Sequence, residues 1–161
     1  MVRMGLASWL LALMLAAPAA ADTRWPEQGW QVLPVTSTYD ELLEALRGAV
    51  DAEGMFIVTE AGPTEAAANR GVTIPGNRVI GVFRNDYAVQ ILRLSVPAMI
   101  EAPLRFYVTE NEDGSATLAW KTPSHVLAHY SEEGGEALAE IGHELDAVFE
   151  AIAHRAVGKI D

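Results

Sequence analysis

Apolar residues recur along this chain with two spacings, one typical of strands and one typical of helices. Short apolar runs predict strands over 30–37, 55–60 and 77–83, and two more within 104–122 surround the hairpin sequence NEDG. Apolar residues three or four positions apart predict helices over 38–54, 85–94 and about 135–157. In the last helix they form one continuous stripe, made of Leu138, Ile141, Leu145, Val148, Phe149 and Ile152.

Proline, glycine and small polar residues mark the ends of several of these elements. Pro34 lies inside the first predicted strand, which indicates an edge position because proline donates no ladder hydrogen bond. A short helix is predicted over 63–71, from Pro63 to Gly71. Asn85 or Asp86 is the expected cap of the helix over 85–94.

The order of the elements predicts the fold class. Hairpin-type strand pairing is mixed with helices, so we expect an α+β fold. It is a mostly antiparallel sheet of about five strands, with two main helices packed on one face and additional short helices.

The first 21 residues have the pattern of a signal peptide. Arg3 is followed by an apolar stretch over about 6–17, and Ala19 and Ala21 occupy the small positions before a cleavage site. The apolar stretch is shorter than the roughly 20 residues that a membrane span requires. We expect export to the periplasm or secretion, without stable membrane association after cleavage.

The remainder of the chain fits one domain. Residues 22–34 are a polar lead-in, whose Trp25 and Trp30 are expected to pack back onto the body. Residues 35–158 are expected to form a single α+β domain, a size that one hydrophobic core can support.

Charge and cysteine content exclude several classes of function. The chain has 22 acidic and 11 basic residues. Only Arg3 among them precedes residue 22, so the part after it has a net charge of about −12. Nucleic acids and anionic lipids require a cationic surface, so neither is an expected partner. The absence of cysteine excludes disulfides, thiol catalysis and thiolate metal sites.

Two histidines four positions apart are the candidate metal ligands. His125 and His129 would share one helical face, and imidazole suits Zn²⁺ and Cu²⁺. Catalytic zinc takes three protein ligands and structural zinc four, so the pair needs donors from the last helix or from a second subunit. The alternative is a structural turn, with one histidine half-buried under the hairpin and the other on the surface.

The turn FRNDY over 83–87 is the candidate ligand site. A strand that enters a helix exposes unpaired N–H groups, and Arg84 beside them could bind a carboxylate or phosphate together with Asn85 and Asp86. The alternative is an ordinary helix start whose arginine is offset by Asp86.

Other patterns carry less chemistry. The chain has no G-x-S-x-G nucleophile motif, and its carboxylates show no pattern that selects an acid–base pair. Phe106, Tyr107 and Trp120 lie on the predicted hairpin strands, where core packing explains them, although one face could line a ligand cleft.

Several short motifs resemble a bacterial family, the domain-of-unknown-function 302 family. The resemblance spans about 35–155 and lies in the segments VFRND, APLRFYV, EDG and TP followed by LAHY. The residues that match are Phe83, Asn85, Pro103, Leu104, Asp113, Gly114, Pro123, Leu127, Ala128 and His129. The resemblance implies a compact α+β domain, often a homodimer, without an agreed biochemical activity.

The chain departs from the family pattern at three places. Gly62-Pro63 stands where many exported members have an Asp-His pair, Arg84 where the turn has glycine, and Asp86 where it has proline. The leading hypothesis is therefore an exported, non-enzymatic domain that binds a small ligand or a metal ion. The alternatives are an enzyme of unrecognised type near Arg84, Asn85 and His129, and a purely structural or protein-interaction domain.

Overall fold

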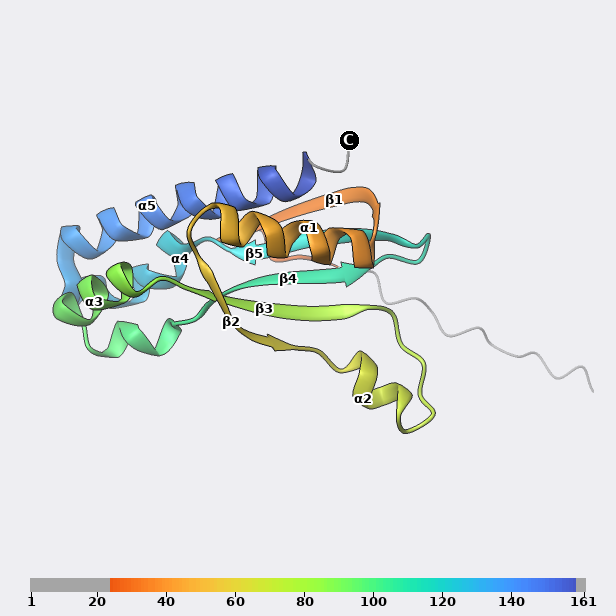
Figure 1. Ribbon diagram of the computed structural model, residues 1–161. Coiled ribbons are helices and arrows are strands. Elements are labelled where there is room, and N and C mark those ends of the chain that lie inside the picture. Colours follow the sequence, from red (N-terminus) through yellow and green to blue (C-terminus); the bar gives the residue numbers. More distant parts are fainter. Residues whose placement is uncertain (1–23, 159–161) are drawn as a thin grey trace, which may run out of the picture.

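The structure, a computed structural model, describes residues 24–158 (Figure 1). Its strands are β1 (Trp30–Thr38), β2 (Phe56–Ala61), β3 (Asn77–Phe83), β4 (Leu104–Glu110) and β5 (Ser115–Lys121). Its α-helices are α1 (Tyr39–Ala52), α2 (Thr64–Ala68), α3 (Asn85–Leu94), α4 (Pro123–Leu127) and α5 (Ser131–Val157). Two 3₁₀ helices, η1 (Pro97–Glu101) and η2 (Ala128–Tyr130), complete the described elements.

The five strands form one antiparallel sheet in the order β1-β5-β4-β3-β2. The predicted α+β class and antiparallel sheet are confirmed. β1 is an edge strand, as its proline predicts, and Pro34 lies opposite Thr117 of β5. The turn between β4 and β5 is tight, because Gly114 adopts a φ of 82° that glycine tolerates without steric cost.

Helices α1 and α5 lie together on one face of the sheet (Figure 1). Strand alternation points every second side chain of the sheet toward them. The largest side chains of this core are completely or almost completely buried: Leu42, Leu46, Ile80, Val82, Phe106, Leu118, Phe149 and Ile152. The opposite face of the sheet is called the open face below.

A second, smaller core lies where the first half of α5 meets α3, η1 and α4. It contains Ile91, Ala98, Leu127, Leu138, Ile141 and Leu145. The helix α5 has one break near its start, at Gly135, whose φ is 59° and ψ is −155°. Its regular part therefore begins after Gly135, where the apolar stripe predicted a helix start.

At two helices the capping residues are those that local sequence preferences favour, and at a third the cap differs from the one expected. Thr38 and Glu41 form a capping box at α1, and Thr122 and Pro123 occupy the cap and first position of α4. At α3 the expectation of an Asn85 or Asp86 cap was wrong. The cap position is Arg84, in extended conformation and without a side-chain capping hydrogen bond, because the helix already begins at Asn85.

The predicted signal peptide, 1–21, lies outside the described residues. Sheet structure begins at Trp30, inside the segment 22–34 that the sequence indicated as a lead-in. Within residues 24–158, no helix has the length and apolar character needed to cross a membrane.

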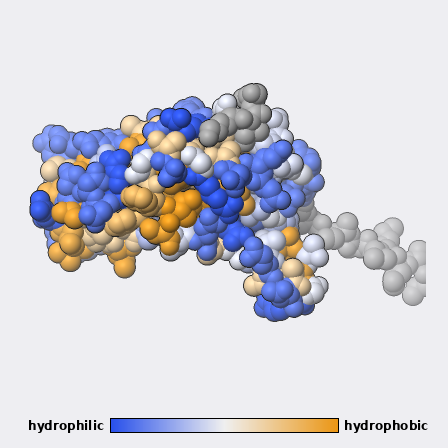
Figure 2. Space-filling model, viewed as in Figure 1, coloured by the Kyte–Doolittle hydropathy of each residue, from blue (hydrophilic) through white to orange (hydrophobic). Residues whose placement is uncertain are grey.

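Apolar side chains also reach the surface of the described residues. Figure 2 shows one apolar area over the start of β2 and another where η1 lies. The large exposed side chains in these two elements and beside η1 are Phe56, Val58, Val96 and Ile100, of which Ile100 is 80% exposed.

Candidate functional site

Arg84 lies between β3 and α3, and its charge is already paired. Its Nε donates to Asp86 Oδ1 at 2.8 Å, and its guanidinium lies 4.2 Å from the ring centre of Tyr87. The hydrogen bond from Arg84 lowers the pKa of Asp86 below its usual value. Near neutral pH, Arg84 and Asp86 therefore form an ion pair with each other. This is the alternative given above, an ordinary helix start whose arginine is offset by Asp86.

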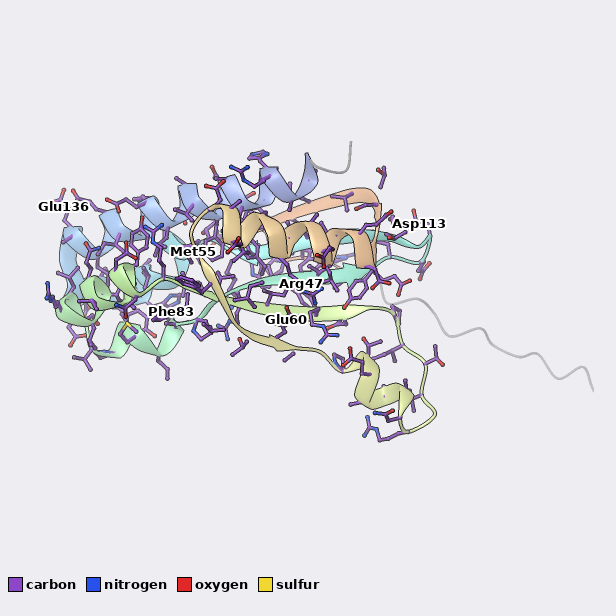
Figure 3. All side chains as sticks on the ribbon, viewed as in Figure 1. Arg47, Met55, Glu60, Phe83, Asp113 and Glu136 are labelled. Carbon is purple, nitrogen blue, oxygen red and sulfur yellow. The ribbon has the colours of Figure 1, made fainter. Side chains whose placement is uncertain are left out.

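The cavity behind this turn is small. It is lined mainly by apolar side chains, among them Met55 and Phe83, which are labelled in Figure 3. Its volume of about 30 Å³ suits one or two water molecules rather than an organic ligand. Asn85 and Asp86 are exposed outside it. Ligand binding by Arg84, Asn85 and Asp86 stays a prediction, and the geometry gives it little support.

The two candidate metal ligands lie on α4 and η2. Both His125 and His129 are exposed, so the alternative in which one is half-buried under the hairpin was wrong. Their ring centres are 5.8 Å apart and the rings are nearly perpendicular, at 88°. His129 Nδ1 lies 3.2 Å from the carbonyl oxygen of Val126.

Helix α5 brings a third imidazole, that of His143, close to His125, but it does not complete a metal site with His125 and His129. His125 and His143 line one groove of about 460 Å³, whereas His129 is not part of its lining. His143 is paired with Asp146, whose other oxygen accepts from the backbone N–H of Ser124. In the described part of the chain, no three histidine, aspartate or glutamate side chains are grouped to hold a metal ion. Binding of Zn²⁺ or Cu²⁺ by His125 and His129 thus stays a prediction that requires a second subunit.

A hollow of similar size to this groove lies on the open face of the sheet. Phe106 points into the core, so its neighbours Arg105 and Tyr107 point to the open face. The volume of this open-face hollow is about 450 Å³, within the range of small-molecule sites. Its lining includes Trp30, Asn77, Arg105, Tyr107, Trp120 and Lys121, and contains no carboxylate.

Two cations are neighbours in the open-face hollow. Lys121 is the register partner of Trp30. The pairing of β4 with β5 ends at Phe106 and Trp120, and Arg105 and Lys121 are the next residues on the two strands. Like charges opposite each other on neighbouring strands are destabilising. Their juxtaposition in an acid-rich chain therefore calls for an explanation beyond stability.

Neither cation is closely paired with a carboxylate. Lys121 Nζ lies 5.6 Å from the ring centre of Trp30, and no carboxylate of residues 24–158 makes an ion pair with it. The Nη2 of Arg105 is 4.0 Å from Glu101, longer than a hydrogen bond. The other oxygen of Glu101 accepts from the Tyr130 hydroxyl at 2.7 Å. The open-face hollow thus holds positive charge in a chain of net charge −11.

Aromatic rings and a third donor complete the open-face hollow. Asn77 Nδ2 donates to the Tyr107 hydroxyl oxygen at 2.5 Å, so the Tyr107 O–H remains able to donate to a ligand. The ring centre of Trp25 lies 5.5 Å from that of Trp30 and 6.0 Å from that of Tyr107. The prediction that Trp25 and Trp30 pack onto the body is confirmed.

Comparison with known proteins agrees with this fold. The family model described as Domain of unknown function DUF302 matches residues 31–152. The chain belongs to the DUF302 family. This DUF302 chain is similar to the crystal structure of an uncharacterized conserved DUF302 protein from Bacillus stearothermophilus, with a TM-score of 0.71 and 17% identity. The similarity covers 80% of this chain and 98% of the other. At 17% identity it shows a shared fold and nothing further.

None of the curated proteins matches this DUF302 chain at a significant level. Its candidate site therefore rests on the geometry of its own residues. Sequence reasoning missed Lys121 and Arg105, because nothing along the chain shows that they share one hollow. The available signal was the hairpin aromatic residues, of which Tyr107 lies on the open face and Phe106 and Trp120 are packed in the core.

Proposed function

We propose that this DUF302 domain binds a small anionic ligand in the open-face hollow. One observation carries the proposal: Arg105 and Lys121 line a hollow of ligand size from which carboxylates are absent. Both are donors suited to a carboxylate or phosphate, and hydrogen bonds to a charged group are the stronger kind. The Tyr107 O–H adds a neutral donor to the same space.

The proposal is of binding rather than of catalysis. The residues that line the open-face hollow include neither an imidazole nor a carboxylate, the groups that most often transfer protons in enzymes. Arginine, lysine and aromatic rings hold and orient an anion, which is sufficient for a binding protein. The alternative enzymatic site near Arg84, Asn85 and His129 has less support, since Arg84 is already paired with Asp86.

We also propose that the chain is exported and forms a homodimer. The pattern of residues 1–21 supports export to the periplasm or secretion. The family resemblance and the exposed apolar side chains of β2 and of the η1 region support self-association. An exported binding domain would meet its ligand outside the cytoplasm.

The test is a titration with two ligands of the same shape and different charge. NMR-monitored titration of the protein with benzoate and with benzamide, at low salt, yields both the dissociation constant and the residues that respond. We expect benzoate to bind at least about tenfold tighter than benzamide, because it forms charge-assisted hydrogen bonds. The resonances of Trp30 and Tyr107 should show the largest changes in chemical shift.

Variants locate the charge effect. Lys121→Met and Arg105→Gln should each weaken benzoate binding about tenfold, the loss of one charge-assisted contact. Arg93→Gln is the matched control, since Arg93 is an exposed arginine of α3 outside the hollow. Equal affinity for benzoate and benzamide, or equal losses in all three variants, would rule out an anion site at this place.

A further inference from the structure

An aromatic ring packs beside the open-face hollow, against two of the residues that line it. Trp25, from the segment before β1, lies against Trp30 at an interplanar angle of 51° and against Tyr107 at 67°. These are tilted and edge-on arrangements, which aromatic pairs favour over a face-to-face stack. Trp30 and Tyr107 both line the hollow. Trp25 itself is not part of the lining, but its packing shows that Trp30 and Tyr107 accept an aromatic ring between them.

Trp25 is attached to the sheet by a short tether with one fixed end. Gly29 has a φ of 70°, and its carbonyl accepts from the N–H of Thr122 at 2.9 Å. The backbone of Gly29 also lies so close to the ring of His125 that a Cβ would not fit between them. In contrast, residues 26–28 are exposed, whereas Trp25 is partly buried. Only the three residues 26–28 thus separate Trp25 from the fixed Gly29, which keeps its ring near this site.

We propose that the ligand of this hollow is an aromatic anion, and that its ring replaces the Trp25 indole on Trp30 and Tyr107. The proposal rests on the anion site proposed above and adds the ligand class and a built-in competitor. A ring placed against Trp30 brings an attached carboxylate close to Lys121, because Lys121 is the register partner of Trp30 and lies over its ring. Arg105 and the Tyr107 O–H complete the set of donors.

Competition by Trp25 follows from its tether. A group on a short linker has a high effective concentration at a site within its reach, so a free ligand must compete with it. The tethered indole lacks an anionic group and makes no use of Lys121 or Arg105, which an aromatic anion does. Trp25 therefore covers the aromatic walls in the absence of ligand and leaves when the ligand binds.

The closing experiment compares ligands and variants on the same protein, the chain from residue 22 to residue 161. Benzoate should bind wild type about tenfold tighter than cyclohexanecarboxylate, which has the same charge without the ring, as expected for two aromatic contacts. Trp25→Ala should tighten benzoate binding about fivefold, the effect of removing a tethered competitor, and leave acetate binding unchanged. Trp25→Phe keeps a ring and should give a smaller change.

A measurement on wild type does not depend on a variant. As benzoate saturates the protein, the indole N–H resonance of Trp25 should move to its solvent-exposed position, and its contacts with Tyr107 should disappear from the NOE spectrum. Weaker benzoate binding in Trp25→Ala, or persistence of those contacts at saturation, would show that Trp25 is a permanent wall and overturn the displacement. Equal binding of cyclohexanecarboxylate would overturn the aromatic class. Loss of the benzoate–benzamide difference, in contrast, rejects the anion site itself.

Discussion

At the scale of single residues, position in the sheet decides between packing and binding. Phe106 and Tyr107 are neighbours in sequence, and strand alternation separates them completely. Phe106 is fully buried, with its ring centre 4.4 Å from that of Phe149 in a stacked arrangement. Tyr107, on the open face, keeps a hydroxyl available to a ligand. An aromatic side chain thus stabilises the fold in one case and offers a contact to a ligand in the other.

The pair Phe106–Phe149 leads to a stability prediction. Phe149→Ala should lower the free energy of unfolding by about 3–5 kcal/mol, through lost apolar burial and the cavity that remains. Urea denaturation followed by circular dichroism measures this loss. Ile100→Ala, at a side chain that is 80% exposed, should change the same quantity by less than about 0.5 kcal/mol. A loss below about 1 kcal/mol for Phe149→Ala would mean that the core does not depend on this contact.

At the scale of elements, the start of α1 shows how local sequence fixes a boundary. Glu41 accepts from both the backbone N–H and the hydroxyl of Thr38, and Thr38 Oγ1 accepts from the backbone N–H of Glu41. This capping box satisfies donors that the first helical turn leaves unpaired. It follows directly on β1, so it also determines where the edge strand ends.

The capping box makes a second prediction. Thr38→Ala removes the hydroxyl and should cost about 1 kcal/mol in the free energy of unfolding. Thr38→Ser retains the hydroxyl and serves as the control, with a much smaller loss. Chemical denaturation measures both variants. Identical stability of the alanine and serine variants would show that the hydroxyl contributes nothing to the start of α1.

At the scale of the whole molecule, acidic residues dominate the surface and several are held by arginines from other elements. Arg47 of α1 donates to both oxygens of Glu60 on β2, at 2.9 and 2.7 Å, as Figure 3 allows the reader to follow. Arg155 near the end of α5 pairs with Glu53 after α1. The hydrogen bond from Arg47 lowers the pKa of Glu60 below 4.5. Such pairs join the sheet edge and the helix layer.

The lowered pKa of Glu60 predicts an acid-dependent loss of stability. Because the folded-state pKa lies below the unfolded value of 4.5, the pair stabilises the fold above that pH. Its contribution is lost as the pH falls through the folded value. Glu60→Gln should therefore be less stable than wild type at about pH 7, and the difference should be smaller at a second, acidic pH below 4.5.

Urea denaturation at both pH values measures this difference. Glu144→Gln is the control, since Glu144 is an exposed glutamate of α5 that forms none of the ion pairs described. An undiminished difference between Glu60→Gln and wild type at low pH would show that the effect comes from packing and not from the charge of Glu60.

The sequence by itself determined the elements of the fold, because their signals are local. Apolar spacing, Pro34 and the NEDG turn each act within a few residues, and each is found where it was predicted. The cap of α3 was missed because Arg84, which has no capping side chain, occupies the position. The family motifs were also readable, since they are turn and strand residues.

Only the tertiary structure decided which chemistry gathers in one place. Lys121 ends the hairpin, Arg105 begins it, and Trp25 and Trp30 precede it by about seventy-five residues or more. Strand pairing and alternation bring Lys121, Arg105 and Trp30 to one hollow, and Trp25 packs beside it. In contrast, His125 and His129 remain a pair without a third ligand in residues 24–158. Local propensity specifies elements, but a binding site is set by the register between strands that are distant in sequence.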